Sequence, residues 1–334
     1  MKERFASLDL FKYFASLCII VIHTEPLSTF NSFWNYFTVQ IIARLAVPFF
    51  AVCTGFLMTR RVLKVQENKP ARREIILGYW KRIIRIYCFW SFVYLLLSIP
   101  RWIQTGWFSV WAFVDYGIAA FRSASYYHLW YLLALIYAIP AFAFCLLFLK
   151  KSIWLPLSAG LYGVYAIYYC YCVLLPSSIQ KVFSALSLFD GLTNGLFLIL
   201  PFLLIGAILA DDRMKFRISY KTGLFFSFLL LCMEAILLDK LGQNKVSYIA
   251  FTYPTALFFF QTVLHVKITK GTQTCRALGT ASLLIYCFHP IIVEVLGEFH
   301  VTPLLRFFIT VIVSTLAGLI WFFYKRERDK LCLH

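Results

Sequence analysis

Long apolar segments recur along the whole 334-residue chain, and they restrict its fold more than any other feature. Most run for roughly 17 to 22 residues, which matches the ~20 helical residues needed to cross a ~30 Å hydrocarbon core. Apolar residues make up 61% of the chain and charged residues only 14%, against roughly 25% charged in soluble domains. Membrane-spanning strands would instead give alternating segments of about ten residues. The pattern predicts an all-α integral membrane protein.

Ten spans are expected in a single membrane domain that covers residues 1–334, because no linker or long polar stretch indicates a second core. The expected spans are residues 8–28, 38–58, 84–100, 128–149, 153–174, 194–210, 223–238, 248–264, 279–297 and 304–324. Helix breaks are possible at the prolines within these spans, at positions 48, 140, 201, 254 and 290. The segment TGFL at residues 54–57 is expected to allow close helix packing.

The distribution of Lys and Arg predicts that both termini face the cytoplasm. In this orientation 24 of the 32 Lys and Arg residues lie in inner segments and six lie in outer ones, as expected for cytoplasmic loops. The net charge of +17 then follows from topology and from contact with anionic headgroups. We therefore expect membrane lipids, and no nucleic acid, as partners of this basic chain.

The first expected span, LDLFKYFASLCIIVIHTEPL, contains four ionisable residues: Asp9, Lys12, His23 and Glu25. A helix places Lys12 and His23 on one face, about 16 Å apart along its axis, and Asp9 can pair with Lys12. Ionisable groups within a span usually face the bundle interior and mark functional sites. The structural alternatives are that Lys12 and Asp9 extend to the inner interface and that His23 bonds to a neighbouring helix.

Further polar residues are expected at the depth of His23, in the outer half of the membrane. Arg44 lies in the second span, His128 at the outer rim of the fourth, and His289 in the ninth. Singly, a histidine among aromatic residues is more often an interface anchor or a core residue. Together with Glu294, also in the ninth span, they predict an outer cavity lined by imidazole, carboxylate and guanidinium groups. Glu234 and Glu298 are expected near outer ends, where water is an adequate partner, and are assigned no role.

Two other patterns bear on binding. The inner segment between residues 59 and 85 is basic and amphipathic, which predicts a helix along the inner headgroups. Ten cysteines occur without a CxxC pair or an alternating Cys/His arrangement, so we interpret them as small buried side chains and expect no metal site.

Several motifs resemble the acyltransferase 3 family of bacterial membrane O-acyltransferases. They are RFASLDLFKYFA with IHTEP, then RLAVPFFAVCTGFLM, HLWYLLAL and SLLIYCFHPIIV, in the family's order from residue 4 to about residue 324. The resemblance implies ten helices in the bacterial cell membrane and transfer of an acyl group from cytoplasmic acyl-CoA to a hydroxyl of a cell-surface glycan. His23 matches the family's functional histidine. Lys12 matches its basic partner, where Arg is usual.

Lys at this position, together with IHT.P, IARLAVPFF.V.TGF and NGLFLILPFLLIGAIL, is similar to the membrane half of the vancomycin-resistance serine racemases. Serine transport is the role implied for that half. This sequence ends at KRERDKLCLH, and we expect no racemase chemistry from it.

The leading hypothesis is therefore an O-acyltransferase that moves an acyl group, most simply acetyl, from acyl-CoA to a surface glycan or lipid-linked sugar. His23 acts as general base or acyl carrier, with Lys12 as the second catalytic residue. The expected substrate-binding residues are Glu25, Arg44, His128, Trp130 and His289. The expected contacts for the CoA phosphates are Arg72, Arg73, Arg82 and Arg85. No permanently bound cofactor is expected, and the oligomeric state is open. A serine transporter and a scaffold without chemistry are the alternatives.

Overall fold

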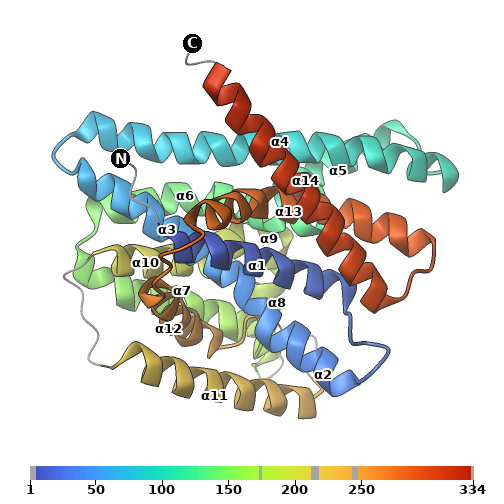
Figure 1. The fold of residues 1–334 in the computed structure, drawn as a ribbon. Coiled ribbons are helices and arrows are strands. Elements are labelled where there is room, and N and C mark those ends of the chain that lie inside the picture. Colours follow the sequence, from blue (N-terminus) through green and yellow to red (C-terminus); the bar gives the residue numbers. More distant parts are fainter. Residues whose placement is uncertain (1–4, 173–174, 212–217, 243–246, 332–334) are drawn as a thin grey trace. The chain divides into compact units, whose positions relative to one another are not determined.

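The computed structural model describes residues 5–172, 175–211, 218–242 and 247–331 (Figure 1). All regular elements within these ranges are helices, which confirms the all-α prediction. The chain forms two compact units, one of residues 1–50 with 217–334 and the other of residues 51–216.

The first unit contains both ends of the described chain. Its elements are α1 (Ala6–Thr24), α2 (Ser32–Tyr36), the π-helix η1 (Phe37–Ile42), the 3₁₀-helix η2 (Ala43–Leu45), the start of α3 (Ala46–Lys64), α11 (Tyr220–Lys240), α12 (Thr252–His265), α13 (Thr272–Glu298) and α14 (Pro303–Leu331). Within it, α13 packs most extensively against α1 and α14, and α11 packs against α12.

The second unit contains the rest of α3 and the central helices. Its elements are α4 (Lys69–Gln104), α5 (Val110–Arg122), the 3₁₀-helix η3 (Tyr127–Leu129), α6 (Trp130–Phe148), α7 (Lys151–Tyr169), α8 (Ser177–Leu186), the 3₁₀-helix η5 (Ser187–Phe189), α9 (Asp190–Thr193), the π-helix η6 (Asn194–Ile199) and α10 (Leu200–Ala210). The basic segment expected along the inner headgroups is largely helical and continues without a break into the third expected span, within α4.

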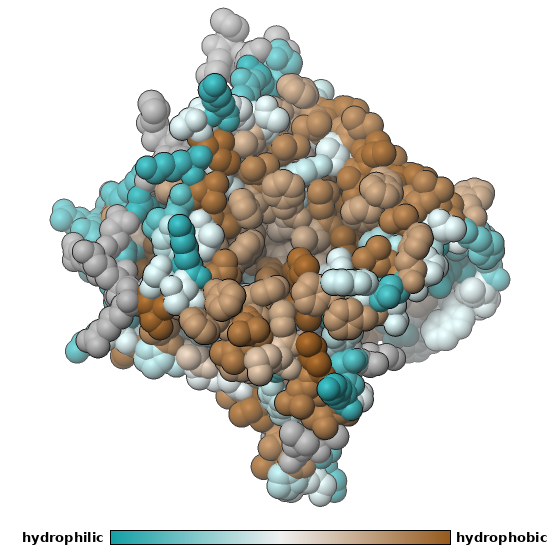
Figure 2. All heavy atoms as spheres, turned by 60° about the horizontal axis from the view of Figure 1, so that its bottom comes forward, coloured by the Kyte–Doolittle hydropathy of each residue, from teal (hydrophilic) through white to brown (hydrophobic). Residues whose placement is uncertain are grey.

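Eight helical stretches of the described ranges are long and apolar enough to cross a membrane. Three of them join adjacent elements, as in Ser32–Lys64, Val110–Phe148 and Asp190–Ala210. Figure 2 shows a face dominated by hydrophobic residues, and large side chains such as Phe225 and Ile320 are more than half exposed. The protein is therefore a multi-pass membrane protein. The other two expected spans fall on α7 and α12, so the count of ten, the orientation and the single-domain organisation stay predictions.

Small residues let the helices of each unit approach closely. In the first unit a Cβ at Gly279 of α13 would lie 2.6 Å from the Asp9 Cα of α1. In the second unit a Cβ at Gly55 of α3 would lie 2.1 Å from the Leu203 carbonyl oxygen, and one at Gly206 of α10 would lie 2.2 Å from the Val52 oxygen. Close packing at the segment TGFL is thereby confirmed.

Two of the five prolines accompany a departure from α-helical geometry. The π-helix η1 and the 3₁₀-helix η2 end just before α3, whose third residue is Pro48, and the π-helix η6 ends just before α10, whose second residue is Pro201. Proline has no N–H and its ring clashes with the carbonyl four residues earlier, which favours such a local change. By contrast, α6 and α13 continue as helices through Pro140 and Pro290.

The structure corrects the expectation that Glu234 of α11 has water as its partner. Glu234 is buried rather than hydrated. Its carboxylate accepts hydrogen bonds from the backbone amides of Ala250 and Phe251, both at 2.8 Å, just before α12 begins. The sequence placed Glu234 near a helix end but gave no sign that a second segment would turn its amides toward it.

Candidate functional site

The first unit brings two of the predicted site histidines together. His23 lies in the last turn of α1, and His289 lies in α13, which packs along α1. Their rings are stacked, with centroids 5.2 Å apart and planes inclined by 27°. Two residues separated by 266 positions therefore form one local cluster.

His289 is completely buried and held by its own helix. Its Nδ1 lies 3.1 Å from the Ile285 carbonyl oxygen. Because a carbonyl can only accept, Nδ1 carries the proton in this contact. His289 also interacts with the Tyr286 carbonyl, which Pro290 leaves without its usual partner. These contacts within α13 fix the ring that stacks on His23.

Arg44 joins this cluster from a third segment. It lies in η2, which packs against α1, and it is within electrostatic range of His23. Its Nε donates to the Gln40 Oε1 at 3.1 Å, and its Cζ lies 6.0 Å from the centroid of the Tyr248 ring. The guanidinium is thus oriented by an amide on one side and an aromatic face on the other.

Sequence reasoning missed Gln40 and Tyr248. The spacing of four residues between Gln40 and Arg44 is a usable signal for a contact along a helix. The sequence gives no comparable signal for Tyr248, because this residue lies in the connection between α11 and α12. It is buried with a φ of 62°, a left-handed conformation uncommon for a bulky residue. Such strained backbone clusters at functional sites.

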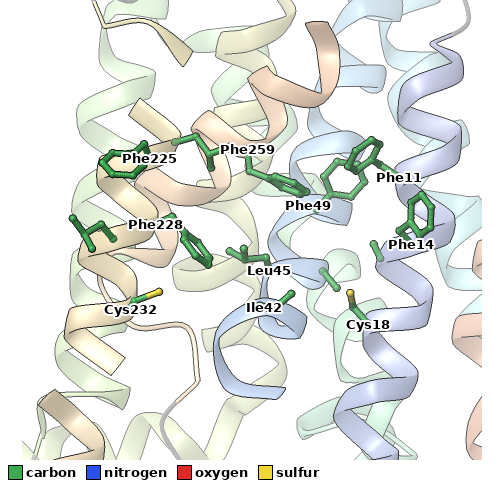
Figure 3. Close-up of a pocket in the computed structure, with 14 residues that line it drawn as sticks. Phe11, Phe14, Cys18, Ile42, Leu45, Phe49, Phe225, Phe228, Cys232 and Phe259 are labelled. Carbon is green, nitrogen blue, oxygen red and sulfur yellow. The ribbon is translucent and has the colours of Figure 1, made fainter. Parts of the chain in front are cut away.

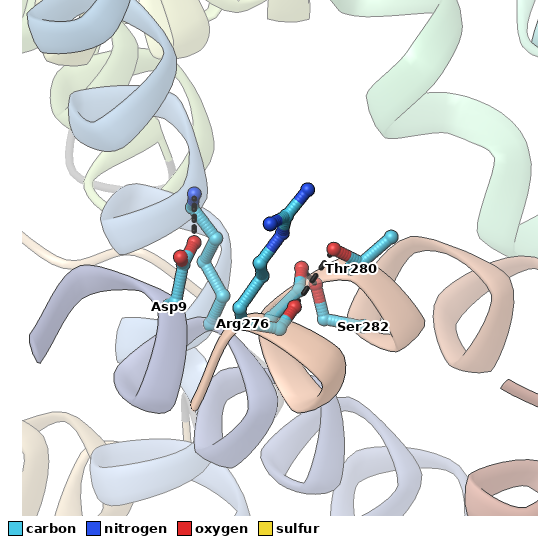
Figure 4. Close-up of polar contacts among 6 residues, drawn as sticks. Asp9, Arg276, Thr280 and Ser282 are labelled. Carbon is cyan, nitrogen blue, oxygen red and sulfur yellow. Dashed lines mark hydrogen bonds and ion pairs between the residues drawn. The ribbon is translucent and has the colours of Figure 1, made fainter. Parts of the chain in front are cut away.

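Lys12 lies in the N-terminal half of α1, eleven residues before His23. Its Nζ is 3.2 Å from Asp9 Oδ1, and both side chains are about one-fifth exposed. This is the ion pair that the spacing suggested. The pair lies where Gly279 lets α13 approach, and Figure 4 shows Arg276 of that helix nearby, with its guanidinium directed away from the Asp9 carboxylate. Lys12 and His23 share one uninterrupted helix.

Glu25 lies at the rim of the site. The α1 helix ends at Thr24, and Glu25 takes up a left-handed conformation with a φ of 44° before Pro26. Its exposed carboxylate accepts a hydrogen bond from the Asn35 Nδ2 at 3.3 Å. The structure therefore groups Glu25 with Asn35 and shows no hydrogen bond from it to the His23 cluster.

The remaining predicted substrate-binding residues belong to the second unit. His128 is buried in η3, and the rings of Tyr94, Tyr126 and Tyr127 surround it at centroid distances of 4.9, 5.8 and 5.5 Å. Trp130 is the first residue of α6. His128 therefore occupies an aromatic cluster of its own.

The four predicted CoA-binding arginines all lie on α4, but on different faces. Arg73 lines a surface groove of about 660 Å³ together with Lys69 and Lys81. Arg85 donates from its Nε to the Lys81 carbonyl at 3.3 Å. Arg72 instead has a buried Nε without a hydrogen-bond partner. Arg82 is exposed but does not line the groove.

Comparison with known proteins gives one family match. A family model described as an acyltransferase domain matches residues 5–324. The chain is 28% identical over 293 residues to a serine/alanine racemase of Enterococcus gallinarum, covering 85% of this chain and 40% of that protein. It is 26% identical over 276 residues to an amino-acid racemase of Enterococcus faecalis, covering 81% and 37%. The chain thus spans less than half the length of these relatives. No solved structure matches it.

Proposed function

The chain belongs to the acyltransferase 3 family, whose model matches residues 5–324, and from this premise we propose that it is an O-acyltransferase of the bacterial cytoplasmic membrane. The donor is cytoplasmic acyl-CoA, most simply acetyl-CoA. The acceptor is a hydroxyl of a cell-surface glycan or lipid-linked sugar. The observation that carries the proposal is the stacking of His23 on His289 with Arg44 in range.

In the proposed reaction His23 is the general base. It takes the proton of the acceptor hydroxyl as that oxygen attacks the thioester carbonyl carbon. The carbon–sulfur bond then breaks, a carbon–oxygen bond has formed, and the CoA thiolate receives the proton. The alternative passes the acyl group through an acyl-imidazole on His23 and gives the same products.

Two neighbours support His23 in this role. His289 holds the His23 ring by stacking, and its own position is set by the Ile285 carbonyl. Arg44, oriented by Gln40, supplies positive charge to the oxygens of the acceptor or to the developing oxyanion. Each group is fixed before reaction, which is the condition for such electrostatic stabilisation to be effective.

The donor phosphates bind at the predicted inner face. Lys12, beside Asp9, supplies a cation on α1, in the position where Arg is usual in the family. A lysine binds phosphate as a point charge rather than through a planar fork. In the second unit, the α4 groove lined by Lys69, Arg73 and Lys81, with Glu74 among them, is a separate candidate for such phosphates.

A second candidate is transport of a small amino acid such as serine. Two observations favour it: the matched relatives are named as amino-acid and serine/alanine racemases, and Arg44 lies in a run where η1 and η2 interrupt the α-helix. Discontinuous helices form substrate sites in many transporters. In this reading Arg44 or Lys12 binds the carboxylate and Glu25 binds the amine.

The test uses the purified protein in sealed vesicles, with labelled acetyl-CoA in one assay and labelled serine in another. Wild type is compared with His23→Ala and with His265→Ala, which removes an exposed histidine of the same unit. We expect label on an acceptor or on the protein, lost at least 100-fold in His23→Ala and unchanged in His265→Ala. Serine accumulation in the vesicles without CoA, together with no His23-dependent labelling, would exclude the transferase hypothesis and support the transporter hypothesis.

A further inference from the structure

An apolar groove of about 710 Å³ lies within the first unit, between α1, α11, α12 and the start of α3 (Figure 3). Phe11 and Phe14 of α1 face Phe225 and Phe228 of α11 across it. Its walls are made of phenylalanine, aliphatic and cysteine side chains and expose almost no polar atoms. The volume falls within the ~300–1,000 Å³ usual for pockets that bury a small molecule.

The lining favours a hydrocarbon chain as occupant. On α1 the groove extends from Phe11 to Cys18 and on α11 from Leu224 to Cys232, about 11 Å along each axis. Both segments lie in the middle of helices able to span a membrane. Without hydrogen-bonding groups the walls cannot bind a sugar or a phosphate. They can only bury apolar groups, over about a third of the ~30 Å hydrocarbon core.

The two ends of the groove differ. At one end the rings of Phe11, Phe49 and Phe259 pack together, with centroids 5.7 to 6.4 Å apart. At the other end lie Ile42, Cys18 and Cys232 (Figure 3). In the predicted orientation the ring cluster faces the cytoplasm. A long acyl chain of a cytoplasmic CoA donor would have to enter through that cluster, whereas an outer-leaflet lipid enters from the opposite end.

The end near Cys18 is next to the proposed catalytic cluster. Arg44 lies between Ile42 and Leu45, which both line the groove, and it is within electrostatic range of His23. His23 follows Cys18 by five residues, which places it about 7.5 Å further along α1 and about 140° around it. A hydrocarbon chain bound in the groove therefore does not reach His23. A polar headgroup attached to that hydrocarbon chain can extend past Arg44 and reach His23.

We propose that this groove binds the hydrocarbon chain of a lipid-linked acceptor, whose phosphate is held by Arg44 and whose sugar hydroxyl is presented to His23. This inference rests on the proposed acyl transfer and selects the lipid-linked sugar among the possible acceptors. Arg44 does not itself line the groove, but it directly precedes Leu45, which does. Its guanidinium supplies the charge complementarity, since its fork suits a phosphate.

Binding of a polyprenyl phosphate to the detergent-purified protein, measured by native mass spectrometry, tests the inference. The blocking variant is Cys232→Trp, which places a large side chain in the groove, and its control is Met233→Trp at the neighbouring, exposed position outside the groove. Leu229→Trp on the same wall replaces Cys232→Trp if that variant does not fold. We expect at least tenfold weaker binding in the blocking variant and in Arg44→Gln, and wild-type binding in Met233→Trp and His265→Ala.

Three results would overturn the inference. The first is unchanged binding of the probe in both folded blocking variants. The second is a loss of binding in Met233→Trp equal to that in the blocking variant. The third is displacement of the probe by an equal concentration of phosphatidylglycerol, which would mark an ordinary lipid site. The acetyl-CoA assay separates this failure from failure of the proposed function. If transfer depends on His23 but Cys232→Trp transfers and binds the probe as wild type does, only the groove proposal is refuted. If the probe binds tightly and Cys232→Trp weakens that binding, but no transfer depends on His23, the transferase is refuted.

Discussion

Replacing Gly55 by alanine should loosen the crossing of α3 and α10. The added Cβ would lie 2.1 Å from the Leu203 carbonyl oxygen and 2.7 Å from its Cα. Both atoms belong to the backbone, so no side-chain rotation can relieve the overlap, and the helices must separate by about 1 Å to restore ordinary contact. Overpacking of this kind costs typically ~1–3 kcal/mol, and a backbone obstacle favours the upper end.

Alanine also has a higher helix propensity than glycine, by about 1 kcal/mol. The net loss expected for Gly55→Ala is therefore about 1–2 kcal/mol in the free energy of unfolding. The matched control is Gly160→Ala on α7, where a Cβ meets nothing within 4 Å; this variant should be neutral or slightly more stable. The two should thus differ by about 2 kcal/mol or more.

The measurement is the midpoint of denaturant-induced unfolding of the purified protein in mixed micelles. A further variant, Gly206→Ala, tests the same crossing from the other helix, because its Cβ would lie 2.2 Å from the Val52 oxygen. Once one Cβ has separated the helices, the second should cost less, so the double variant should be less destabilised than the sum. Equal midpoints for Gly55→Ala and Gly160→Ala would refute the reasoning.

Three further perturbations follow from the described contacts. Glu234→Ala should destabilise the protein by about 3 kcal/mol, since two buried amides lose a charged acceptor; an unchanged unfolding midpoint would exclude this role. Lys12→Arg should keep transfer from acetyl-CoA within about threefold while Lys12→Ala loses tenfold or more, because only the first keeps a charge beside Asp9; similar rates for both would argue against a phosphate contact. Tyr248→Ala should lower kcat about three- to tenfold by releasing Arg44, and wild-type turnover would show that the ring does not position it.

Hydropathy predicted the membrane helices well because the length of a span is set by the bilayer rather than by tertiary contacts. It did not predict the local geometry. The expected second span covers η1, η2 and most of α3, and its departure from α-helix was signalled only by Pro48. The short α12 was expected as a full span, yet only Thr252–His265 is helical. The start of such a helix depends on the groups that bond the backbone amides before it. For α12 that group is the Glu234 carboxylate, which comes from another helix and cannot be read from the α12 sequence.

The candidate site was partly predictable for a related reason. Periodicity along one helix places Lys12 and His23 on one face and Asp9 beside Lys12, since these relations are local. Stacking of His23 on His289 depends on how α1 and α13 pack, and no pattern within either helix specifies that partner. Gly279 marks α13 as able to approach another helix closely, but the sequence does not identify α1 as that helix.

The backbone around the cluster explains how polar groups can gather at this depth. His23 directly precedes the end of α1, Arg44 lies four residues before Pro48, His289 precedes Pro290, and Tyr248 is left-handed. Each position is thus next to an interruption of regular helix bonding. In a membrane such backbone is tolerated only where it is buried in protein or lines a water-filled cavity. An acceptor hydroxyl needs the same conditions, because its proton must leave along polar groups in a site closed to lipid.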